Sequence, residues 1–181
     1  MEISDTRVML KDGTGVLLLP VSPCDRQCIL DGFEQLSDRS RYSRYHTPMR
    51  TLPDDYLDCL TGADNYNNVV VAAQLDQEGV QVGIALARYV RLQDEPGVAE
   101  FSVTVVDAYQ NLGLGTLLLE YLMQHARENQ ISLLRGYVLP GNEAMFRMLK
   151  RYAASKHHDS DGSLCFELDP SEAIYKDSVI V

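Results

Sequence analysis

Apolar and polar positions in the N-terminal third of the chain follow first a strand-like and then a helix-like pattern. An apolar, partly β-branched run at residues 16–21 predicts a first strand. Ser22 and Pro23 then supply an N-cap and a proline at the first helical position, so residues 23–36 are predicted to form a helix. Two shorter helices are expected next, at residues 37–45 and 53–60.

Beyond Gly62 the pattern changes to the two-residue period of strands. Turn-forming Asp, Glu, Gly and Pro residues divide this region into three predicted antiparallel strands, at residues 69–75, 80–91 and 98–106. A helix at 116–129, a strand at 133–139, a helix from Asn142 to about Tyr152 and a hairpin of residues 155–158 and 163–168 follow. This order predicts one α/β (α+β) domain over residues 1–181, with a mixed, mostly antiparallel sheet of about six or seven strands flanked by helices.

A glycine-rich stretch, Gln-Asn-Leu-Gly-Leu-Gly at residues 110–115, lies between the last of these strands and the helix of residues 116–129. The first N–H groups of a helix lack intrahelical partners and carry partial positive charge, so they bind a phosphate favourably. Gly113 and Gly115 remove the Cβ atoms that would hold a pyrophosphate away from these groups. The stretch is therefore predicted to bind phosphate through donors from Asn111 to Thr116.

Two familiar phosphate-binding loops do not fit this stretch. A Walker loop needs lysine and then Ser or Thr after its second glycine, whereas Thr116 and Leu117 follow Gly115. The dinucleotide fingerprint G-x-G-x-x-G follows the first strand of a βαβ unit, whereas this loop follows a late, antiparallel strand. A nucleotide triphosphatase and an NAD-binding domain are both disfavoured.

Composition bounds the kind of protein. With 181 residues, 45% of them hydrophobic, the chain is long enough for one domain with a substantial core. A formal net charge of −10 argues against a nucleic-acid partner, for which a basic patch is usual. The same charge suits a basic or amine-bearing acceptor, and it equally suits a solvated acidic surface that aids solubility.

The sequence shows neither a secretory signal nor a membrane-spanning run, so a cytoplasmic protein without a membrane partner is expected. Its four cysteines are too few and too scattered for a disulfide scaffold. Cys24 and Cys28 lie one helical turn apart and would supply half of a metal site, but no second pair of ligands is evident. No metal is therefore expected.

The glycine loop has the form Q-x-x-G-x-G, which resembles the acetyl-CoA pyrophosphate loop of the GCN5-related N-acetyltransferase (GNAT) family, usually Q/R-x-x-G-x-G/A. Residues 36–45 look like the LSxxSRYxRF segment of the bacterial protein lysine acetyltransferases, the Pat group. Residues 99–103 and 107–110 look like that group's fourth strand, and the order of predicted elements matches the family's fold over nearly the whole chain. The resemblance implies a cofactor cleft between splayed fourth and fifth strands, acetyl-CoA as co-substrate, and direct acetyl transfer to an amine. No second, regulatory domain is expected in a chain of 181 residues.

Glu100 is the candidate general base. Lysine has a reference pKa of about 10.4 and arrives mostly as ammonium, so a base must remove a proton before its nitrogen attacks the thioester. In an alternating strand Glu100 shares one face with Ser102 and Thr104. Spacing alone favours a solvent-exposed strand residue without a function. The resemblance implies catalysis instead, because the matching glutamate of the Pat group acts as general base, through water.

The resemblance also implies the cofactor contacts. In the family the pantetheine arm adds like a strand to the splayed end of the fourth strand, and backbone N–H groups there polarise the thioester carbonyl. The asparagine that opens the next helix contacts the cofactor, caps that helix, or does both. The expected cofactor-binding set is Val103, Thr104, Val105, Gln110, Asn111, Leu112, Gly113, Leu114, Gly115, Thr116 and Asn142.

One residue of the family's site is missing. Many relatives carry, seven residues after this asparagine, a tyrosine that protonates the leaving thiolate, whereas this chain has Leu149 there. Tyr152 lies one turn later and is expected to pack in the core. The general acid is therefore left unassigned, and solvent or the proton displaced from the ammonium group could complete the step instead.

Other polar residues near the predicted site are ambiguous. Arg39, Arg41 and Arg44 either line the acceptor entrance or pair with the acidic surface, and pairing is the favoured interpretation. His46, in a loop, is a weak candidate for the acceptor side. His125, on the helix of residues 116–129, is expected to be exposed.

The preferred acceptor is a protein lysine, by resemblance to the Pat group. Two rivals stay open: an acetyltransferase for small amines such as polyamines, aminoglycosides or amino acids, and a non-catalytic acyl-CoA sensor, which the missing tyrosine favours and Glu100 opposes. The sequence decides neither the length of the acyl group nor the oligomeric state. The apolar tail, residues 179–181, could add to a sheet edge within one subunit or between the subunits of a homodimer.

Overall fold

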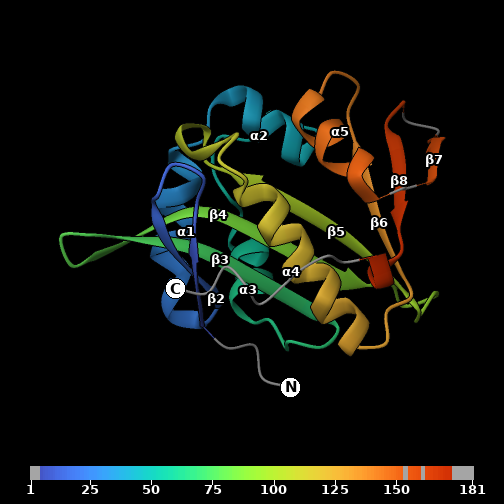
Figure 1. Cartoon of the computed structure of the whole chain (residues 1–181), viewed down its shortest axis with the longest axis horizontal. Coiled ribbons are helices and arrows are strands. Elements are labelled where there is room, and N and C mark those ends of the chain that lie inside the picture. Colours follow the sequence, from blue (N-terminus) through green and yellow to red (C-terminus); the bar gives the residue numbers. More distant parts are fainter. Residues whose placement is uncertain (1–4, 153–154, 160–161, 173–181) are drawn as a thin grey trace.

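One sheet of eight strands organises the chain in a computed structural model that describes residues 5–152, 155–159 and 162–172 (Figure 1). The strands are β1 (Thr6–Met9), β2 (Gly15–Pro20), β3 (Asn68–Gln77), β4 (Val80–Arg91), β5 (Val98–Val105), β6 (Leu133–Val138), β7 (Ser155–His158) and β8 (Leu164–Leu168). The helices are α1 (Arg26–Glu34), α2 (Asp38–Tyr45), α3 (Asp54–Thr61), α4 (Leu114–Glu128) and α5 (Glu143–Leu149). Four short 3₁₀ turns are η1 (Pro23–Asp25), η2 (Asp107–Tyr109), η3 (Lys150–Tyr152) and η4 (Pro170–Glu172).

The strand order is β1-β2-β3-β4-β5-β6-β8-β7, and the pairing is antiparallel except between β5 and β6. That parallel ladder is short, because it holds only from Val98 opposite Leu133 to Glu100 opposite Arg135. Beyond these residues β5 continues to Val105 and β6 to Val138, but the two strands no longer pair with each other. The sheet therefore opens between its fifth and sixth strands.

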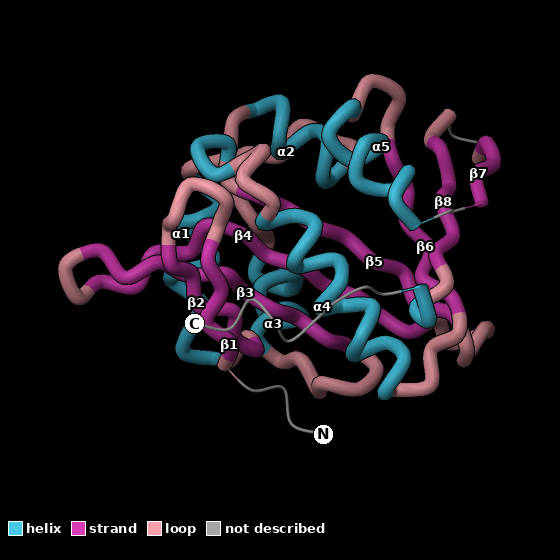
Figure 2. Tube along the Cα trace, viewed as in Figure 1, coloured by secondary structure: helices cyan, strands magenta, loops and turns pink. Residues whose placement is uncertain are grey.

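Helices cover both faces of the sheet (Figures 1 and 2). α4 lies across one face and buries Leu118, Leu119 and Leu122, whose spacing places them on one side of the helix, against Phe101 and the main core. α1, α2 and α3 cover the opposite face through two smaller apolar clusters that contain Phe33 and Leu60. The layers leave the open ends of β5 and β6 accessible.

Most elements confirm the sequence prediction. The differences are one additional strand and shifts of one or a few residues at element ends. β1 was not expected; its four residues bury only Val8 and pair with β2, which raises the strand count to eight. α4 begins two residues earlier than predicted, so Gly115 lies in its first turn. The predicted helix of residues 23–36 begins with the turn η1 before α1.

One further expectation is contradicted by the structure, and one concerns residues that the structure does not describe. The expectation that His125 is exposed is wrong, since the side chain is 6% exposed and packs edge-on against Tyr121, on the face of α4 that meets the core. The apolar tail of residues 179–181, which could add to a sheet edge or fray, lies outside the described residues.

Candidate active site

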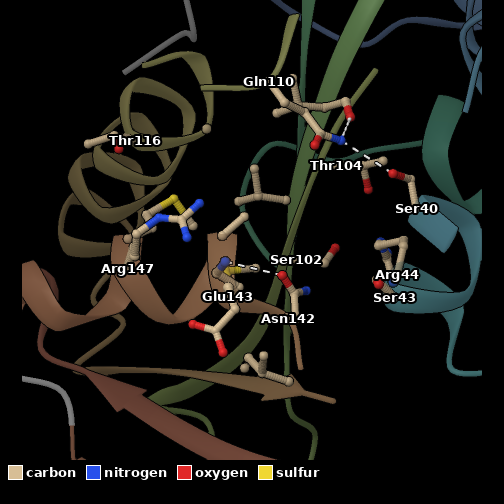
Figure 3. Close-up of a pocket in the computed structure, with 18 of the residues that line it drawn as sticks. Ser40, Ser43, Arg44, Ser102, Thr104, Gln110, Thr116, Asn142, Glu143 and Arg147 are labelled. Atoms are coloured by element: carbon tan, nitrogen blue, oxygen red, sulfur yellow. Dashed lines mark hydrogen bonds between the residues drawn. The ribbon is translucent and has the colours of Figure 1, made fainter. Parts of the chain in front are cut away.

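A cleft of about 1270 Å³ opens where β5 and β6 separate. Its walls come from both strands, the glycine loop, the first turn of α4, α5 and α2. In Figure 3, Ser43 and Arg44 lie on the α2 side, Asn142 lies on the α5 side, and Ser102 of β5 lies between them. Segments far apart in the sequence thus meet around one opening.

Ten of the twelve residues predicted for the site line this cleft. They are Glu100, Val103, Thr104, Val105, Gln110, Asn111, Gly113, Gly115, Thr116 and Asn142. Leu112 and Leu114 do not, because their side chains pack into the core and Leu114 is 1% exposed. Only the main-chain groups of these two leucines are left for contact with a ligand.

Glu100 lies on β5 at the last pair before the strands separate, and its side chain is exposed. Its neighbour in the parallel register is Arg135. The Arg135 guanidinium binds Glu95 at 2.9 Å and Glu167 at 3.1 Å instead. Within the described residues no hydrogen bond or ion pair engages the Glu100 carboxylate, so it is free to accept a proton.

The glycine loop turns sharply into α4. Asn111 has φ 64° and Gly113 has φ 95°, both in the left-handed region that favours glycine and asparagine. Gly113 occupies the N-cap position without a side chain to cap the helix, and the first intrahelical bond runs from the N–H of Leu117 to its carbonyl at 3.1 Å. The N–H groups of residues 114–116 therefore precede the helical ladder and are available to an anion.

Lys11 is a cleft residue that the sequence did not reveal. It follows β1 in the turn toward β2, and its backbone N–H donates to the Leu112 carbonyl at 3.3 Å. The side chain runs along the glycine loop, so that a Cβ added to Gly113 would lie 3.5 Å from Lys11 Cε. The short hairpin β1–β2 thus brings a cation to the phosphate-binding loop, and only the undetected strand β1 would have indicated it.

A hydrogen-bond network joins the glycine loop to α2. The Asp107 carboxylate accepts from the N–H of Ser37 at 2.9 Å and from the hydroxyls of Ser37 at 2.7 Å and Ser40 at 2.9 Å. Burial alone would raise the pKa of Asp107, but these hydrogen bonds outweigh it and lower that pKa. The Gln110 side chain donates to the carbonyl of Val105 at 3.0 Å and to Ser40 at 3.3 Å. The two walls of the cleft are therefore linked at the end of β5.

Asn142 is the N-cap of α5. Its Oδ1 accepts from the N–H of Met145 at 3.2 Å, which fixes the side chain at the edge of the cleft (Figure 3). The oxygen is used for capping, and the amide NH₂ group remains for a ligand.

Leu149, at the position of the family's tyrosine, and Tyr152 both lie in the core. Leu149 is fully buried. Tyr152 is 3% exposed and its hydroxyl donates to Glu120 of α4 at 2.8 Å, away from the cleft. As expected, Tyr152 packs in the main core.

Within the described residues no ion pair joins an arginine of α2 to a carboxylate, contrary to the favoured interpretation. Arg41 stacks over Phe33 at 4.5 Å from the ring centroid. Arg44 donates to the hydroxyl of Tyr56 at 2.7 Å, and Arg39 and Arg44 line the cleft together with His46. α2 therefore presents cationic side chains to the opening.

Searches for two other kinds of site gave negative results within the described ranges. There, no group of three or more His, Cys, Asp or Glu residues is arranged to hold a metal ion. No helix in those ranges is both long and apolar enough to cross a bilayer.

Comparisons with known proteins give a consistent result. The family model described as "Acetyltransferase (GNAT) family" matches residues 30–153, which is more than half of the chain. Acetyltransferase PA5475 from Pseudomonas aeruginosa is 29% identical over 136 residues, which cover 75% of this chain and 73% of that protein. Acetyltransferase Pat from Mycolicibacterium smegmatis is 29% identical over 170 residues, which cover 92% of this chain and 49% of that protein. The chain thus spans about half the length of the M. smegmatis relative.

Solved structures agree in fold. The GNAT domain of S. lividans PAT superposes with a TM-score of 0.83 at 28% identity, covering 91% of this chain and 96% of that domain. The structure of yncA from Salmonella typhimurium, solved with its cofactor acetyl-CoA, superposes with a TM-score of 0.67 at 19% identity, covering 90% of this chain and 98% of that one, which supports the fold alone.

Proposed function

The chain belongs to the acetyltransferase (GNAT) family and is an acetyl-CoA-dependent N-acetyltransferase, and from this premise we propose that it acetylates protein lysines by direct transfer, with Glu100 as the general base. Direct transfer means that donor and acceptor occupy the cleft together. The amine nitrogen then attacks the thioester without an acyl-enzyme intermediate.

The position of Glu100 is the observation that carries this proposal. Its exposed carboxylate lies at the base of the opening between β5 and β6, and no cation in the described ranges pairs with it. A carboxylate held by Arg135 would be a weaker base, because a nearby cation favours the ionised form. Left unpaired, Glu100 can take the ammonium proton through a water molecule and leave a neutral amine to attack.

The phosphate end of acetyl-CoA fits the glycine loop. The N–H groups of residues 114–116 and the ammonium group of Lys11 supply positive potential on one side of the cleft. The absence of a side chain at Gly113 leaves the loop accessible to a pyrophosphate. These residues would bind and orient the donor without taking part in bond formation.

The pantetheine end fits the open edge of β5. Residues 103–105 line the cleft, and β6 no longer supplies main-chain partners there. The Val105 carbonyl is already engaged by Gln110, so the main-chain groups of Val103 and Thr104 are the more accessible ones. The side chains of Val103 and Val105 pack against the core. When bound, acetyl-CoA supplies an activated acyl group, and β5 orients it beside Glu100.

A protein acceptor is supported by the shape of the site and by its similarity to the Pat group. Glu100 is exposed on an open face of the sheet, which a lysine projecting from a folded protein can reach. The segment that resembles Pat sequences, residues 36–45, contributes Arg39, Ser40, Ser43 and Arg44 to the acceptor side of the cleft. The similarity to acetyltransferase Pat and to the GNAT domain of S. lividans PAT points the same way.

The proposal is tested by supplying acetyl-CoA to the purified protein with three sets of acceptors: proteins of a cell lysate, lysine peptides, and small amines such as polyamines, aminoglycosides and amino acids. We expect new acetyl-lysine in specific proteins, detected by mass spectrometry, and its loss in Glu100→Gln. Rapid acetylation of a small amine, with protein lysines left unmodified, would overturn the protein acceptor. An undiminished Glu100→Gln protein would overturn the general base.

A further inference from the structure

The leaving group of this reaction needs an acid that the sequence did not identify. As the C–S bond breaks, sulfur carries a negative charge that a proton must neutralise. Leu149 stands where many relatives have a tyrosine, and it is fully buried, so it can contribute nothing. Another residue of the cleft that carries a proton can supply it.

Tyr137 lies on the β6 wall of the cleft. The last pair of the parallel ladder is Glu100 with Arg135, so two residues further along each strand are Ser102 and Tyr137. Side chains alternate along a strand, and these two therefore lie on the same face as Glu100, on opposite walls of the opening. Both line the cleft. On the proposed placement of acetyl-CoA, the sulfur of a pantetheine arm between the separated strands would lie at this level.

Three other tyrosines of the region make contacts of their own. Tyr152 donates to Glu120, and the hydroxyl of Tyr109 accepts from Gln77 at 3.4 Å. The ring of Tyr45 packs edge-on against Phe33 and Tyr56, with centroids 5.9 Å apart in each case. In the described ranges no hydrogen bond engages the Tyr137 hydroxyl, which is thus available to a ligand.

From this geometry, and resting on the proposed placement of acetyl-CoA, we propose that Tyr137 is the general acid that protonates the leaving CoA thiolate. Nitrogen loses one proton to Glu100 before attack, and Glu100 passes this proton to solvent. A second nitrogen proton goes to a water molecule as the C–N bond forms. The C–S bond breaks with its electron pair on sulfur, which takes the hydroxyl proton of Tyr137. The protonated water then returns its proton to the phenolate, so that one proton is released to solvent in each turnover.

The charges around Tyr137 keep it protonated until sulfur takes the proton. Burial raises its pKa, and Cys165 on β8, Glu100 on β5 and Asp159 after β7 act in the same direction. Arg135 on β6 opposes them. Because the pKa stays above the ordinary value of about 10, the phenol is neutral over the whole working range of pH. A raised pKa also suits reprotonation by water after each turnover.

The decisive experiment compares the wild type with Tyr137→Phe, which removes only the hydroxyl. The acceptor is whichever amine the wild type acetylates fastest, protein or small molecule. For acetyl-CoA we expect kcat to fall roughly 100-fold, the range typical of a lost general acid. The dissociation constant of CoA, measured by calorimetry, should change by less than about twofold, because the thiol end contributes little binding.

The leaving group supplies the sharper readout. The donors are a series of acetyl thioesters whose thiols range from alkyl thiols to acidic aryl thiols. A thiol acidic enough to leave without a proton should abolish the difference in rate between the wild type and Tyr137→Phe. We expect the loss in Tyr137→Phe to shrink to less than roughly threefold for the most acidic thiol, and its rate to depend more steeply on thiol pKa than that of the wild type. Tyr66→Phe, a substitution far from the cleft, is the matched control.

Two results would overturn the assignment: an unchanged kcat with acetyl-CoA, or an equal loss for every thiol, which would indicate a structural role. Either leaves the proposed function intact if the wild type acetylates lysine in a Glu100-dependent way. Conversely, a Glu100→Gln protein that keeps full activity refutes the proposed base, while the thiol series still reports on the acid.

Discussion

Arg135 stands beside Glu100 in the register of β5 and β6, yet its guanidinium turns away to Glu95 and Glu167. These two carboxylates hold, at 2.9 and 3.1 Å, the cation that stands beside the base in the strand register. The pKa of Arg135 is raised by these partners, chiefly by Glu95, so the guanidinium stays charged and bound. The arrangement keeps Glu100 unpaired at the opening of the sheet.

Releasing Arg135 should weaken the base. In the double variant Glu95→Gln, Glu167→Gln we expect Arg135 to pair with Glu100, which lowers the pKa of that carboxylate. The rate should fall roughly threefold to tenfold, and the acidic limb of the pH–rate profile should move to lower pH. Adding Arg135→Gln should restore the rate. If the triple variant is as slow as the double, the release of Arg135 is not the cause.

Removing the carboxylate should cost far more. Glu100→Gln keeps the size and hydrogen-bonding capacity of the side chain but cannot take a proton. We expect kcat/KM near neutral pH to fall by roughly 100-fold or more, with recovery as rising pH deprotonates the amine without help. Steady-state kinetics across pH would check this, with Asp94→Asn on the exposed turn before β5 as a charge-matched control. A loss that is constant at all pH values would contradict the assignment.

Lys11 should contribute to binding of the phosphates alone. Lys11→Met removes the ammonium group and keeps the apolar stem that lies along Gly113. We expect the dissociation constant of CoA to rise roughly threefold to tenfold, because a hydrogen bond to a charged group contributes about 1.5 kcal/mol or less when exposed.

A donor without phosphates provides the internal control for Lys11. The kinetics with S-acetyl-pantetheine should not change in Lys11→Met, since that donor lacks the pyrophosphate. Arg7→Met removes a cation from the same hairpin outside the cleft and should leave both donors unaffected. Equal losses with both donors would mean that Lys11 supports the hairpin only.

Asp107 should hold α2 in place. Asp107→Ala removes the acceptor for three hydrogen bonds from Ser37 and Ser40. We expect the free energy of unfolding to fall by about 1–2 kcal/mol and the KM for the acceptor to rise, because α2 forms the acceptor wall. Urea denaturation and kinetics would measure both. Asp38→Ala, also in the first turn of α2 but without these bonds, should leave the acceptor KM unchanged.

His125 should make stability depend on pH. Burial lowers its pKa from the ordinary value of about 6.5, although Glu128 at 3.4 Å opposes the shift. Between the lowered pKa and 6.5 the unfolded state binds more protons, so the free energy of unfolding rises with pH there and falls on acidification. Chemical denaturation of the wild type and His125→Gln from pH 5 to 8 would show a smaller slope in the variant. An equal slope would assign the effect to another group.

The sequence was sufficient for the fold and for one half of the site. The glycine loop and the alternation around Glu100 are local patterns, so their elements and their approximate positions were predictable. The same holds for Asn142, whose capping role depends on the next few residues. Ten of the predicted site residues meet in one cleft because the elements that carry them all border the opening between β5 and β6.

What could not be predicted depends on long-range contact. β1 has four residues and one buried side chain, too few to register as a strand, and Lys11 became visible only when that strand was paired. His125 has no local signal for burial, because the packing of Tyr121 and the core decides it. The arginines of α2 were expected to find carboxylates, but an aromatic ring and a hydroxyl were nearer. Tyr137 could not be predicted as a site residue from local pattern, because its place opposite Ser102 follows from the strand register.

The short parallel ladder has a mechanical consequence. Within the described residues, strand pairing between the five strands on one side and the three on the other is limited to residues 98–100 of β5 and 133–135 of β6. A donor arm that bonds to both separated edges would bridge these two halves as an additional strand, so occupancy of the cleft and the rigidity of β6, β8 and β7 rise together. The amide hydrogens of those three strands should therefore exchange more slowly once CoA is bound, and each product release would remove this additional strand from the sheet.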